Sequence, residues 1–416
     1  MPEELPILFI GGLFDEEQRN EVDRLSTGSV QSAADVLQWG YVHGLEALPD
    51  SSLSIRSAPF VGSYPRRYSR IWIRGRKMSY GDKEENRIVG FLNLALVKQL
   101  WAPAALTRST QQWLTRHPGE GVVFGYALTL QTLFPLWSAK RRAPSVTAIA
   151  IVPDLPEFMN TSSRRRPLRT PAKKIVSAML RRMLSQLDGM VILTEHMAER
   201  LPPLPHVVIE GIIDEGRTAT DGSEVRSRHG LSEAERVLLY SGGLNEKYGV
   251  LRLCEAFRAL DAPDLRLVLC GAGDAASEIV EHARQDDRIR FLGRLPRSDV
   301  LALQSTSLAL VNPRSSDEEF SRYSFPSKIL EYLSAQRPVL CYKLDGIPDD
   351  YDQHLRYVAG PTVEDLTRAL QQIIDQPPEQ LAAIGMAGRN FVVDQKNPRA
   401  QVRKVMAALR PDPRWE

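Results

Sequence analysis

The sequence is poor in the residues that build metal centres and disulfide frameworks. Its 416 residues include 3 cysteines and 7 histidines. Cys254, Cys270 and Cys341 lie far apart in apolar surroundings without the CxxC spacing of a zinc site, so we expect reduced core thiols. The histidines are scattered and form no HxxxH pair, which predicts no dedicated protein-bound metal.

Long apolar runs and a strong net charge are missing as well. No stretch approaches the roughly 20 apolar residues that cross a bilayer. The acidic start MPEELPILFIGG lacks the basic residues of a signal peptide. The formal net charge is only +2, so bulk charge predicts no nucleic-acid partner. We therefore expect a cytoplasmic globular protein, and its length allows two or three domains.

Apolar strands and helices alternate along the chain. The candidate strands form two series, 7–12, 122–127, 146–152, 189–194 and 206–211, then 236–243, 265–271, 288–293, 308–313 and 338–342. Helical stretches such as 250–260 and 297–306 separate them. This alternation predicts an α/β protein with parallel sheets and helices on both faces.

The boundary between the two series predicts the domain organisation. Residues 214–235 are polar and free of long apolar runs, so we interpret them as a linker. It would separate two Rossmann-like domains at 1–213 and 236–393. Residues 394–416 look like terminal helices that return to the first domain.

The stretch FPSKILEYLSAQRPVL, residues 325–340, is typical of a helix followed by a strand. Pro326 suits a first turn, Ser327 can cap exposed N–H groups, and Pro338 would end the helix. Ser327 and Glu331 then share one face, with Lys328 beside them. A helix start with a hydroxyl and an amine favours an anion, and a carboxylate one turn further can accept hydrogen bonds from a diol. Phosphate followed by a diol describes a nucleotide.

Four stretches of the second half occur in the order found in a known family. They are YSGGLNEKYGVLRLCEAF from residue 240, LVLCGAGD from 267, the run 290–314, and FPSKILEYLSAQRPVL. This half resembles GT-B glycosyltransferases, above all the family 4 retaining enzymes that use nucleotide sugars. Stretches 31–48, 58–68, 152–160, 192–201 and 207–214 resemble bacterial members that build exopolysaccharide, capsule or related glycans. The resemblance implies a GT-B architecture, two Rossmann-like domains facing a central cleft.

The resemblance also implies a donor site. Glu331 would hold the ribose hydroxyls, and Ser327 and Lys328 would meet the pyrophosphate. Lys247 would neutralise the leaving diphosphate, and the pair Gly242-Gly243 would let the backbone approach the donor. The remaining donor residues that we assign are Asn245, Gly271, Gly273, Leu295, Arg314, Tyr323, Ser324 and Phe325.

Two positions depart from the family pattern. Many members carry a second glutamate eight residues before the ribose-binding one, where this chain has Tyr323, and a basic residue where it has Gly243. Candidates to replace them are Glu318, Glu319, Arg314 and Arg322.

The segment Gly271-Ala-Gly273-Asp-Ala-Ala276 matches the dinucleotide fingerprint G-x-G-x-x-A. However, the next candidate strand ends in Gly293 and not in the acidic residue that binds a ribose. A tight strand-to-helix turn beside the donor is the better interpretation, and we expect no cofactor.

The first half contributes candidates for the acceptor side. Asp154 follows an apolar strand and is a candidate base, although a structural turn aspartate explains it as well. Gly11, Gly12 and Gly28 indicate a flexible loop that could approach the acceptor. Arg66 and Arg67 lie in the basic and aromatic run 63–80, which favours an acceptor carrying phosphate.

Residues 158–187 carry eight basic side chains and no acidic one, and from Ile175 onward their pattern is that of an amphipathic helix. The basic residues are Arg164, Arg165, Arg166, Arg169, Lys173, Lys174, Arg181 and Arg182. A solvated face on a core-packing helix and docking of 164–184 on anionic lipid both fit this pattern. Nothing supports a nucleic acid there.

These features predict transfer of a sugar from a nucleotide-diphosphate sugar to a glycan or lipid-linked saccharide, at the cytoplasmic membrane face and with retained configuration. Asp154 and Lys247 are the candidate catalytic residues. No DxD-like pair lies in a plausible donor loop, so we expect no metal. The alternatives are a sugar-nucleotide epimerase or a phosphorylase of the same fold, and a catalytically inactive, membrane-docked glycan-binding subunit.

Overall fold

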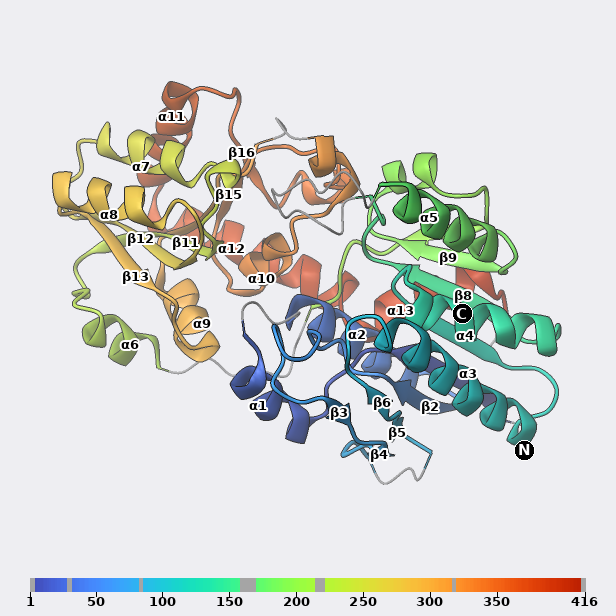
Figure 1. Cartoon of the computed structure of the whole chain (residues 1–416). Coiled ribbons are helices and arrows are strands. Elements are labelled where there is room, and N and C mark those ends of the chain that lie inside the picture. Colours follow the sequence, from blue (N-terminus) through green and yellow to red (C-terminus); the bar gives the residue numbers. More distant parts are fainter. Residues whose placement is uncertain are drawn as a thin grey trace. The chain divides into compact units, whose positions relative to one another are not determined.

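The computed structural model describes residues 4–27, 32–81, 85–157, 170–213, 221–315 and 319–412. The chain divides into two compact units (Figure 1). Unit 1 is Met1–Ile212 together with Pro398–Glu416, and unit 2 is Ile213–Asn397.

Unit 1 contains an eight-stranded sheet in the order β10-β9-β8-β7-β1-β2-β5-β4. Neighbouring strands are parallel except β4 and β5. The strands are β1 Leu5–Gly11, β2 Ser51–Ser57, β4 Arg76–Lys77, β5 Arg87–Ile88, β7 Val122–Tyr126, β8 Thr147–Val152, β9 Gly189–Ile192 and β10 His206–Val208. A separate antiparallel pair is formed by β3 Trp72–Ile73 and β6 Phe91–Leu92.

Helices cover both faces of this sheet, which is why β1 is buried from Ile7 to Gly11. The helices are α1 Glu16–Leu25, α2 Ser32–Glu46, α3 Lys98–Arg116, α4 Leu130–Arg142, α5 Thr170–Leu184 and α13 Pro398–Leu409. Parallel crossovers are right-handed. The connections running from β7 toward β10 therefore place α4 and α5 on one face, and the β1-to-β2 connection places α2 on the other. Helix α3 packs against α4, and α13 packs against α2.

The last helix closes unit 1 at a small residue. A Cβ on Gly44 of α2 would overlap the carbonyl of Pro398, so glycine is needed for α13 to approach. From α13, Gln401 Nε2 donates to Gly211 O at 2.9 Å, and Lys404 Nζ donates to Val208 O at 3.0 Å. The helix thus anchors the chain next to β10.

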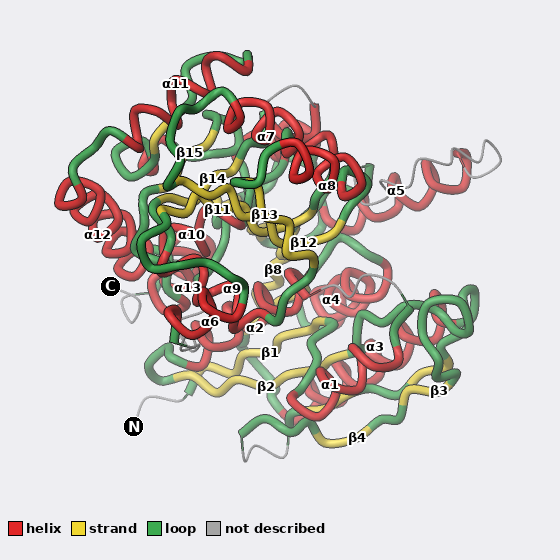
Figure 2. The backbone as a smooth tube through the Cα atoms, turned by 90° about the vertical axis from the view of Figure 1, so that its left-hand side faces the viewer, coloured by secondary structure: helices red, strands yellow, loops and turns green. Residues whose placement is uncertain are grey.

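Unit 2 contains six parallel strands in the order β13-β12-β11-β14-β15-β16. They are β11 Arg236–Gly243, β12 Leu265–Ala272, β13 Ile289–Gly293, β14 Ala309–Asn312, β15 Val339–Cys341 and β16 Arg356–Tyr357. The helices are α6 Gly222–Arg228, α7 Val250–Arg258, α8 Ala276–Gln285, α9 Arg297–Thr306, α10 Lys328–Ser334, α11 Val363–Ile374 and α12 Pro378–Gln395. Figure 2 shows α7 and α8 on one side of this sheet and α6 and α9 on the other.

The predicted linker at 214–235 is wrong for its second part. Residues 222–228 form α6, and Val225 and Leu231 are buried in the core of unit 2. The polar sequence concealed this because Arg226 is held by backbone carbonyls, with Nη1 donating to Thr306 O at 3.1 Å and Nη2 to Ser232 O at 2.6 Å. Residues 214–220 lie outside the described part.

The predicted thiols are confirmed as core residues of unit 2. Cys254, Cys270 and Cys341 are free and buried. Burial raises the pKa of Cys254 and of Cys270 to about 12, so both stay protonated and unreactive at neutral pH.

Candidate functional site

The strand order of unit 2 points to one place for a ligand. The chain starts at β11, builds β12 and β13 on one side, and then returns to add β14 on the other. Open parallel sheets bind ligands outside the carboxyl ends of the strands at such a reversal. The β11 strand ends in Gly242-Gly243, and Arg314 follows β14. Sequence-predicted donor residues therefore lie at the switch point.

The turns after β11 and β12 interlock through their backbones. Leu244 N donates to Ala272 O at 3.0 Å, and Ala275 N donates to Leu244 O at 3.0 Å. Gly271 has φ +148°, and a Cβ there would overlap Gly242 O, while one on Gly273 would overlap Leu244 O. This close approach accounts for the G-x-G-x-x-A segment without a dinucleotide.

Cationic side chains surround this double turn. Lys247 Nζ lies 5.5 Å from the ring centroid of Tyr248, and the Arg314 guanidinium lies 5.7 Å from the same centroid. Arg314 also donates to Ser324 Oγ at 3.3 Å, and burial lowers its pKa. The Lys328 side chain approaches Gly242, with Cε 3.8 Å from the position of a Cβ there. Three positively charged side chains thus lie around Gly242, which is half-buried, and Gly243, which is exposed.

Glu331 is mostly buried, with 17% of its side chain exposed, and it has three donors around it. Its Oε1 accepts from Lys328 Nζ at 2.8 Å and from Gln304 Nε2 at 2.7 Å, and Arg297 Nη1 lies 3.3 Å from Oε2. Burial raises the pKa of Glu331, but the charge and hydrogen bond of Lys328, the Gln304 hydrogen bond and the charge of Arg297 outweigh it. The net result is a lowered pKa and an ionised carboxylate.

A buried hydrogen-bond network contacts Glu331 through Gln304. Gln304 of α9 is fully buried, and its Nε2 also donates to Ser241 Oγ at 3.0 Å. Ser241 N donates to Tyr332 Oη at 2.8 Å, and Tyr332 Oη donates to Ser241 O at 3.1 Å. The network links α9, β11 and α10. Sequence reasoning missed Gln304 and Arg297, and the only available signal was a glutamine inside the apolar stripe of α9.

Residues 221–391 match the family described as "Glycosyl transferases group 1". Over these residues the chain is similar to members of that family. The match contains β11 to β16 and every residue of the site described above, and we call it the group 1 domain.

Curated relatives match about a third of this chain. One component of the phosphatidylinositol N-acetylglucosaminyltransferase from Homo sapiens is 26% identical over 143 residues, 33% of this chain and 27% of the relative. An N-acetyl-alpha-D-glucosaminyl L-malate synthase from Bacillus anthracis is 25% identical over 134 residues, 31% of this chain and 33% of the relative. The chain thus matches about a third or less of the relatives' length.

A solved structure matches nearly the whole chain. HepE from Anabaena, solved in complex with UDP, superposes with a TM-score of 0.60 and 13% identity, covering 97% of this chain and 100% of that one. At this identity the likeness shows the fold alone. The predicted GT-B fold is confirmed.

Other predicted donor residues of the group 1 domain vary in exposure. Tyr323 and Phe325 are buried, and the Phe325 ring lies 5.4 Å from that of Tyr351 in the core. Asn245 precedes the 3₁₀ turn Glu246–Tyr248, and Leu295 packs partly against the core. Arg322 lies at the limit of an ion pair with Asp345, 4.0 Å away. Glu318 lies outside the described residues, as does the side chain of Glu319.

The expected cap at Ser327 is wrong. Helix α10 begins at Lys328 and Ser327 itself is helical, with φ −51° and ψ −21° and no side-chain cap hydrogen bond. A capping residue needs extended backbone to turn its oxygen toward the next N–H groups. The buried stripe of Ile329, Leu330 and Leu333 is confirmed.

The glycines predicted for the acceptor side have a packing role in unit 1. Gly11 and Gly12 are buried, and a Cβ would overlap Gln38 at the first and the ring of Phe60 at the second. Gly12 N donates to Gln38 Oε1 at 2.8 Å. The expectation of a flexible loop is therefore wrong for these two, and Gly28 lies outside the described residues.

The remaining acceptor candidates are exposed. Arg66 and Arg67 lie in an exposed turn, and Asp154 is exposed just after β8. Although the Asp154 side chain keeps contact with solvent, partial desolvation raises its pKa. A raised pKa suits a proton acceptor.

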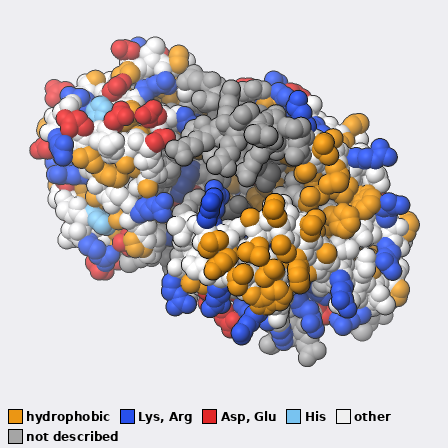
Figure 3. Space-filling model, viewed as in Figure 1, with side chains coloured by type: hydrophobic (Ala, Val, Ile, Leu, Met, Phe, Trp, Pro, Cys, Tyr) orange, Lys and Arg blue, Asp and Glu red, His pale blue; other side chains and the backbone are white. Residues whose placement is uncertain are grey.

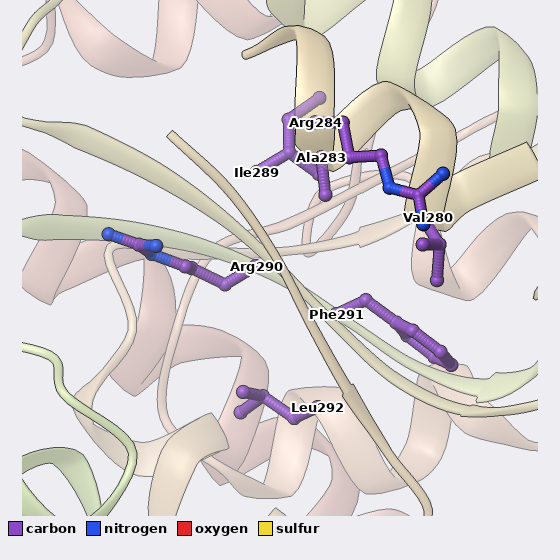
Figure 4. A pocket seen from close by; sticks show the side chains of 7 residues that line it. All are labelled: Val280, Ala283, Arg284, Ile289, Arg290, Phe291 and Leu292. Atoms are coloured by element: carbon purple, nitrogen blue, oxygen red, sulfur yellow. The ribbon is translucent and has the colours of Figure 1, made fainter. Parts of the chain in front are cut away.

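A hollow of about 310 Å³ lies between α8 and the edge strand β13 (Figure 4). Its lining residues, among them Arg284, Arg290 and Phe291, include no predicted donor residue. Within the described residues, no group of three or more His, Cys, Asp and Glu side chains could hold a metal ion. Nor does any described helix have the length and apolarity to cross a membrane.

Proposed function

We propose that this protein transfers a sugar from a nucleoside-diphosphate sugar to a hydroxyl of a glycan or lipid-linked saccharide, with retention of the anomeric configuration. The observation that carries the proposal is the ionised Glu331 beside the interlocked glycine turns at the switch point of the group 1 domain. A carboxylate accepts from a diol, and glycine turns flanked by cations suit a diphosphate.

Glu331 binds the ribose in this proposal. Its Oε1 is occupied by Lys328 and Gln304, whereas Oε2 faces Arg297 alone among the contacts described. Oε2 is therefore the oxygen with capacity for ribose hydroxyls, since a carboxylate oxygen accepts more than one hydrogen bond. Gln304 and Lys328 hold the carboxylate in place.

The diphosphate lies over Gly242 and Gly243 in this proposal, where Lys247, Lys328 and Arg314 supply positive charge. As the bond from the anomeric carbon to the diphosphate oxygen breaks, negative charge grows on the leaving group. Fixed cations that meet this growing charge lower the barrier.

The new bond forms on the same face of the sugar. The acceptor oxygen bonds to the anomeric carbon, and its proton passes to an oxygen of the leaving diphosphate, so no separate nucleophile is required. Asp154 of unit 1, with its raised pKa, is the alternative proton acceptor. Arg66 and Arg67 would bind phosphate on the acceptor.

The relatives suggest which substrates to test first. Both curated names contain an N-acetylglucosaminyl group, and HepE was solved with UDP. The human name adds phosphatidylinositol. These support UDP-N-acetylglucosamine as the first donor and a lipid-linked acceptor.

A lipid-linked acceptor also requires access to a membrane. We place the protein at the cytoplasmic face, with residues 164–184 toward anionic lipid. In the described part of this segment, Ile175 is 69% exposed and Met179 42% exposed. Lys174 and Arg182 are exposed as well, whereas Arg181 pairs with Glu157. Residues 164–169 and the side chain of Lys173 lie outside the described part.

A screen of nucleotide sugars by thermal shift tests the donor half of the proposal. A ligand at 100 times its dissociation constant adds about 2.7 kcal/mol of stability. NMR of the anomeric proton during the first minutes of transfer then reads the stereochemistry. An inverted product would contradict retention. Binding without transfer or hydrolysis would instead favour a glycan-binding subunit, which the buried Tyr323 in place of the family's glutamate supports.

A further inference from the structure

Large apolar side chains are exposed almost entirely on unit 1. Among the residues that the structure describes, the one exposed on unit 2 is Met386, at 46%. Six others come together in unit 1 and form what we call the tryptophan patch, namely Ile71, Trp72, Leu96, Val97, Leu100 and Trp101. Leu96 is 84% exposed and Leu100 76%. Single exposed apolar residues are ordinary, but a cluster of this kind marks a binding surface.

Local structure brings the members of the tryptophan patch together. The rings of Trp72, in β3, and Trp101, in α3, lie 5.7 Å apart and nearly perpendicular. Asn93 N donates to Ile71 O at 2.7 Å, which ties β3 to the segment leading into α3. Leu96 lies in the turn that leads into α3, and Leu100 lies in the first turn of that helix. Figure 3 shows apolar side chains gathered over this part of unit 1, with lysine and arginine side chains along the border.

The two segments that carry the patch contain only basic charges. Residues 61–81 and 91–112 contain no aspartate or glutamate, whereas their basic residues are Arg66, Arg67, Arg70, Arg74, Arg76, Lys77, Lys98 and Arg108. Arg70 pairs with Glu21 at 2.8 Å and Arg76 with Asp15 at 2.6 Å. Arg66, Arg67 and Arg74 are exposed and lie within eight residues of Trp72 in the sequence.

We propose that the tryptophan patch docks this protein onto a bilayer that contains anionic lipid. Tryptophan favours the boundary between headgroups and acyl chains, leucines insert below it, and each basic residue near an anionic surface adds on the order of 1 kcal/mol. A second copy of the chain fits less well, because a two-fold interface would place the same basic border against itself. This inference rests on the proposed function, in which the acceptor is lipid-linked. The tryptophan patch is a separate surface that lies outside the segment 164–184.

Flotation of the full chain with phosphatidylcholine vesicles, with and without phosphatidylglycerol, tests this surface. We expect the wild type to float with the anionic vesicles and to be released as salt rises, because screening weakens the basic contribution. The double substitution Leu96→Ser and Leu100→Ser should lower the partition coefficient at least tenfold. Both side chains are mostly exposed, so an unchanged melting temperature is expected, and Met386→Ser is the matched control that should float like the wild type.

Three outcomes would overturn the proposal. The first is a wild type that ignores anionic vesicles at low salt. The second is a double variant that floats like the wild type while Ile175→Ser with Met179→Ser does not, which would move the contact to α5. The third is a wild-type dimer in light scattering that becomes monomeric in the double variant, which would make a second copy the occupant. A chain that floats but transfers no sugar would remove only the proposed function.

Discussion

Each unit has a pair of glycines at the end of its first strand, and the two pairs have different surroundings. Gly11-Gly12 ends β1 and leads out of it, and both residues are buried against Gln38 and Phe60. Gly242-Gly243 ends β11, where Gly243 is exposed. A Cβ on Gly243 would lie 3.1 Å from the Asn245 amide and 3.2 Å from the Tyr248 ring, both of which belong to side chains. The same motif serves packing in one unit, and in the other we propose that it leaves room for the donor.

The largest effect should come from Lys247, the cation beside Gly242-Gly243. Lys247→Ala should lower kcat by about 10²–10³ while the dissociation constant of the donor changes less, because the charge on the diphosphate grows in the transition state. Steady-state kinetics and donor titration measure the two quantities. A variant that raises only KM would make Lys247 a simple binding residue, and Lys247→Arg should recover part of the turnover.

Glu331→Gln should weaken donor binding by about 10- to 100-fold, which corresponds to the roughly 1.5–3 kcal/mol of a hydrogen bond to a charged group. Isothermal titration with the donor or its nucleoside diphosphate measures the loss. The melting temperature checks the fold. Unchanged affinity would remove Glu331 from the site and with it the proposed ligand role of the β11 end.

The two glycine pairs give a matched test of the comparison itself. Gly12→Ala should destabilise the protein by about 1–3 kcal/mol through overpacking against Phe60 and leave donor affinity unchanged. Gly243→Ala should do the reverse, weakening the donor with little change in melting temperature. Denaturant unfolding and donor titration on both variants would decide, and two variants with the same profile would contradict the distinction.

Gln304→Leu should weaken the donor by about tenfold, near the 1.4 kcal/mol that a tenfold change represents. The pH profile separates positioning from a merely structural role. The folded-state pKa of Glu331 is lowered, so donor binding is lost as pH falls through it. Without the Gln304 hydrogen bond that pKa rises, and the loss should begin at a higher pH. If donor affinity falls by the same factor at every pH, Gln304 only stabilises the fold.

The smallest expected effect is that of a chelator. Lys247, Lys328 and Arg314 lie where a metal ion would otherwise neutralise the diphosphate, so activity should survive EDTA. Activity that vanishes with EDTA and returns with Mg²⁺ would contradict this expectation.

The fold was largely predictable because β strands buried on both faces are continuous apolar runs. All ten predicted strands appear within two or three residues at either end. The missed strands are the two-residue strands β3, β4, β5, β6 and β16 and the longer β2, SSLSIRS, in which only Leu53 and Ile55 are apolar. It holds a buried arginine, Arg56, whose guanidinium donates to Ile55 O at 3.0 Å and to Glu85 O. Such backbone partners depend on tertiary structure and leave no periodic pattern.

The contacts of the site were predictable where they join residues close in sequence. They were not predictable where the order of the strands in the sheet brings distant segments together. Lys328 and Glu331 are three residues apart, so their ion pair follows from helix geometry. Gln304 and Arg297 reach Glu331 from α9, 27 and 34 residues earlier in the chain. Only the order β12-β11-β14 brings these helices together. The role of Gly12 depends in the same way on Phe60.

The anchoring of α13 at Gly44 has a consequence for biosynthesis. Unit 1 begins the chain, yet it requires a helix translated after the whole of unit 2. Domains generally fold as they leave the ribosome. Here the first half must wait, with Gly44 of α2 not yet covered by α13, while unit 2 already holds all of its strands. The emergence of α13, and not that of β10, is thus the event that lets the N-terminal core close.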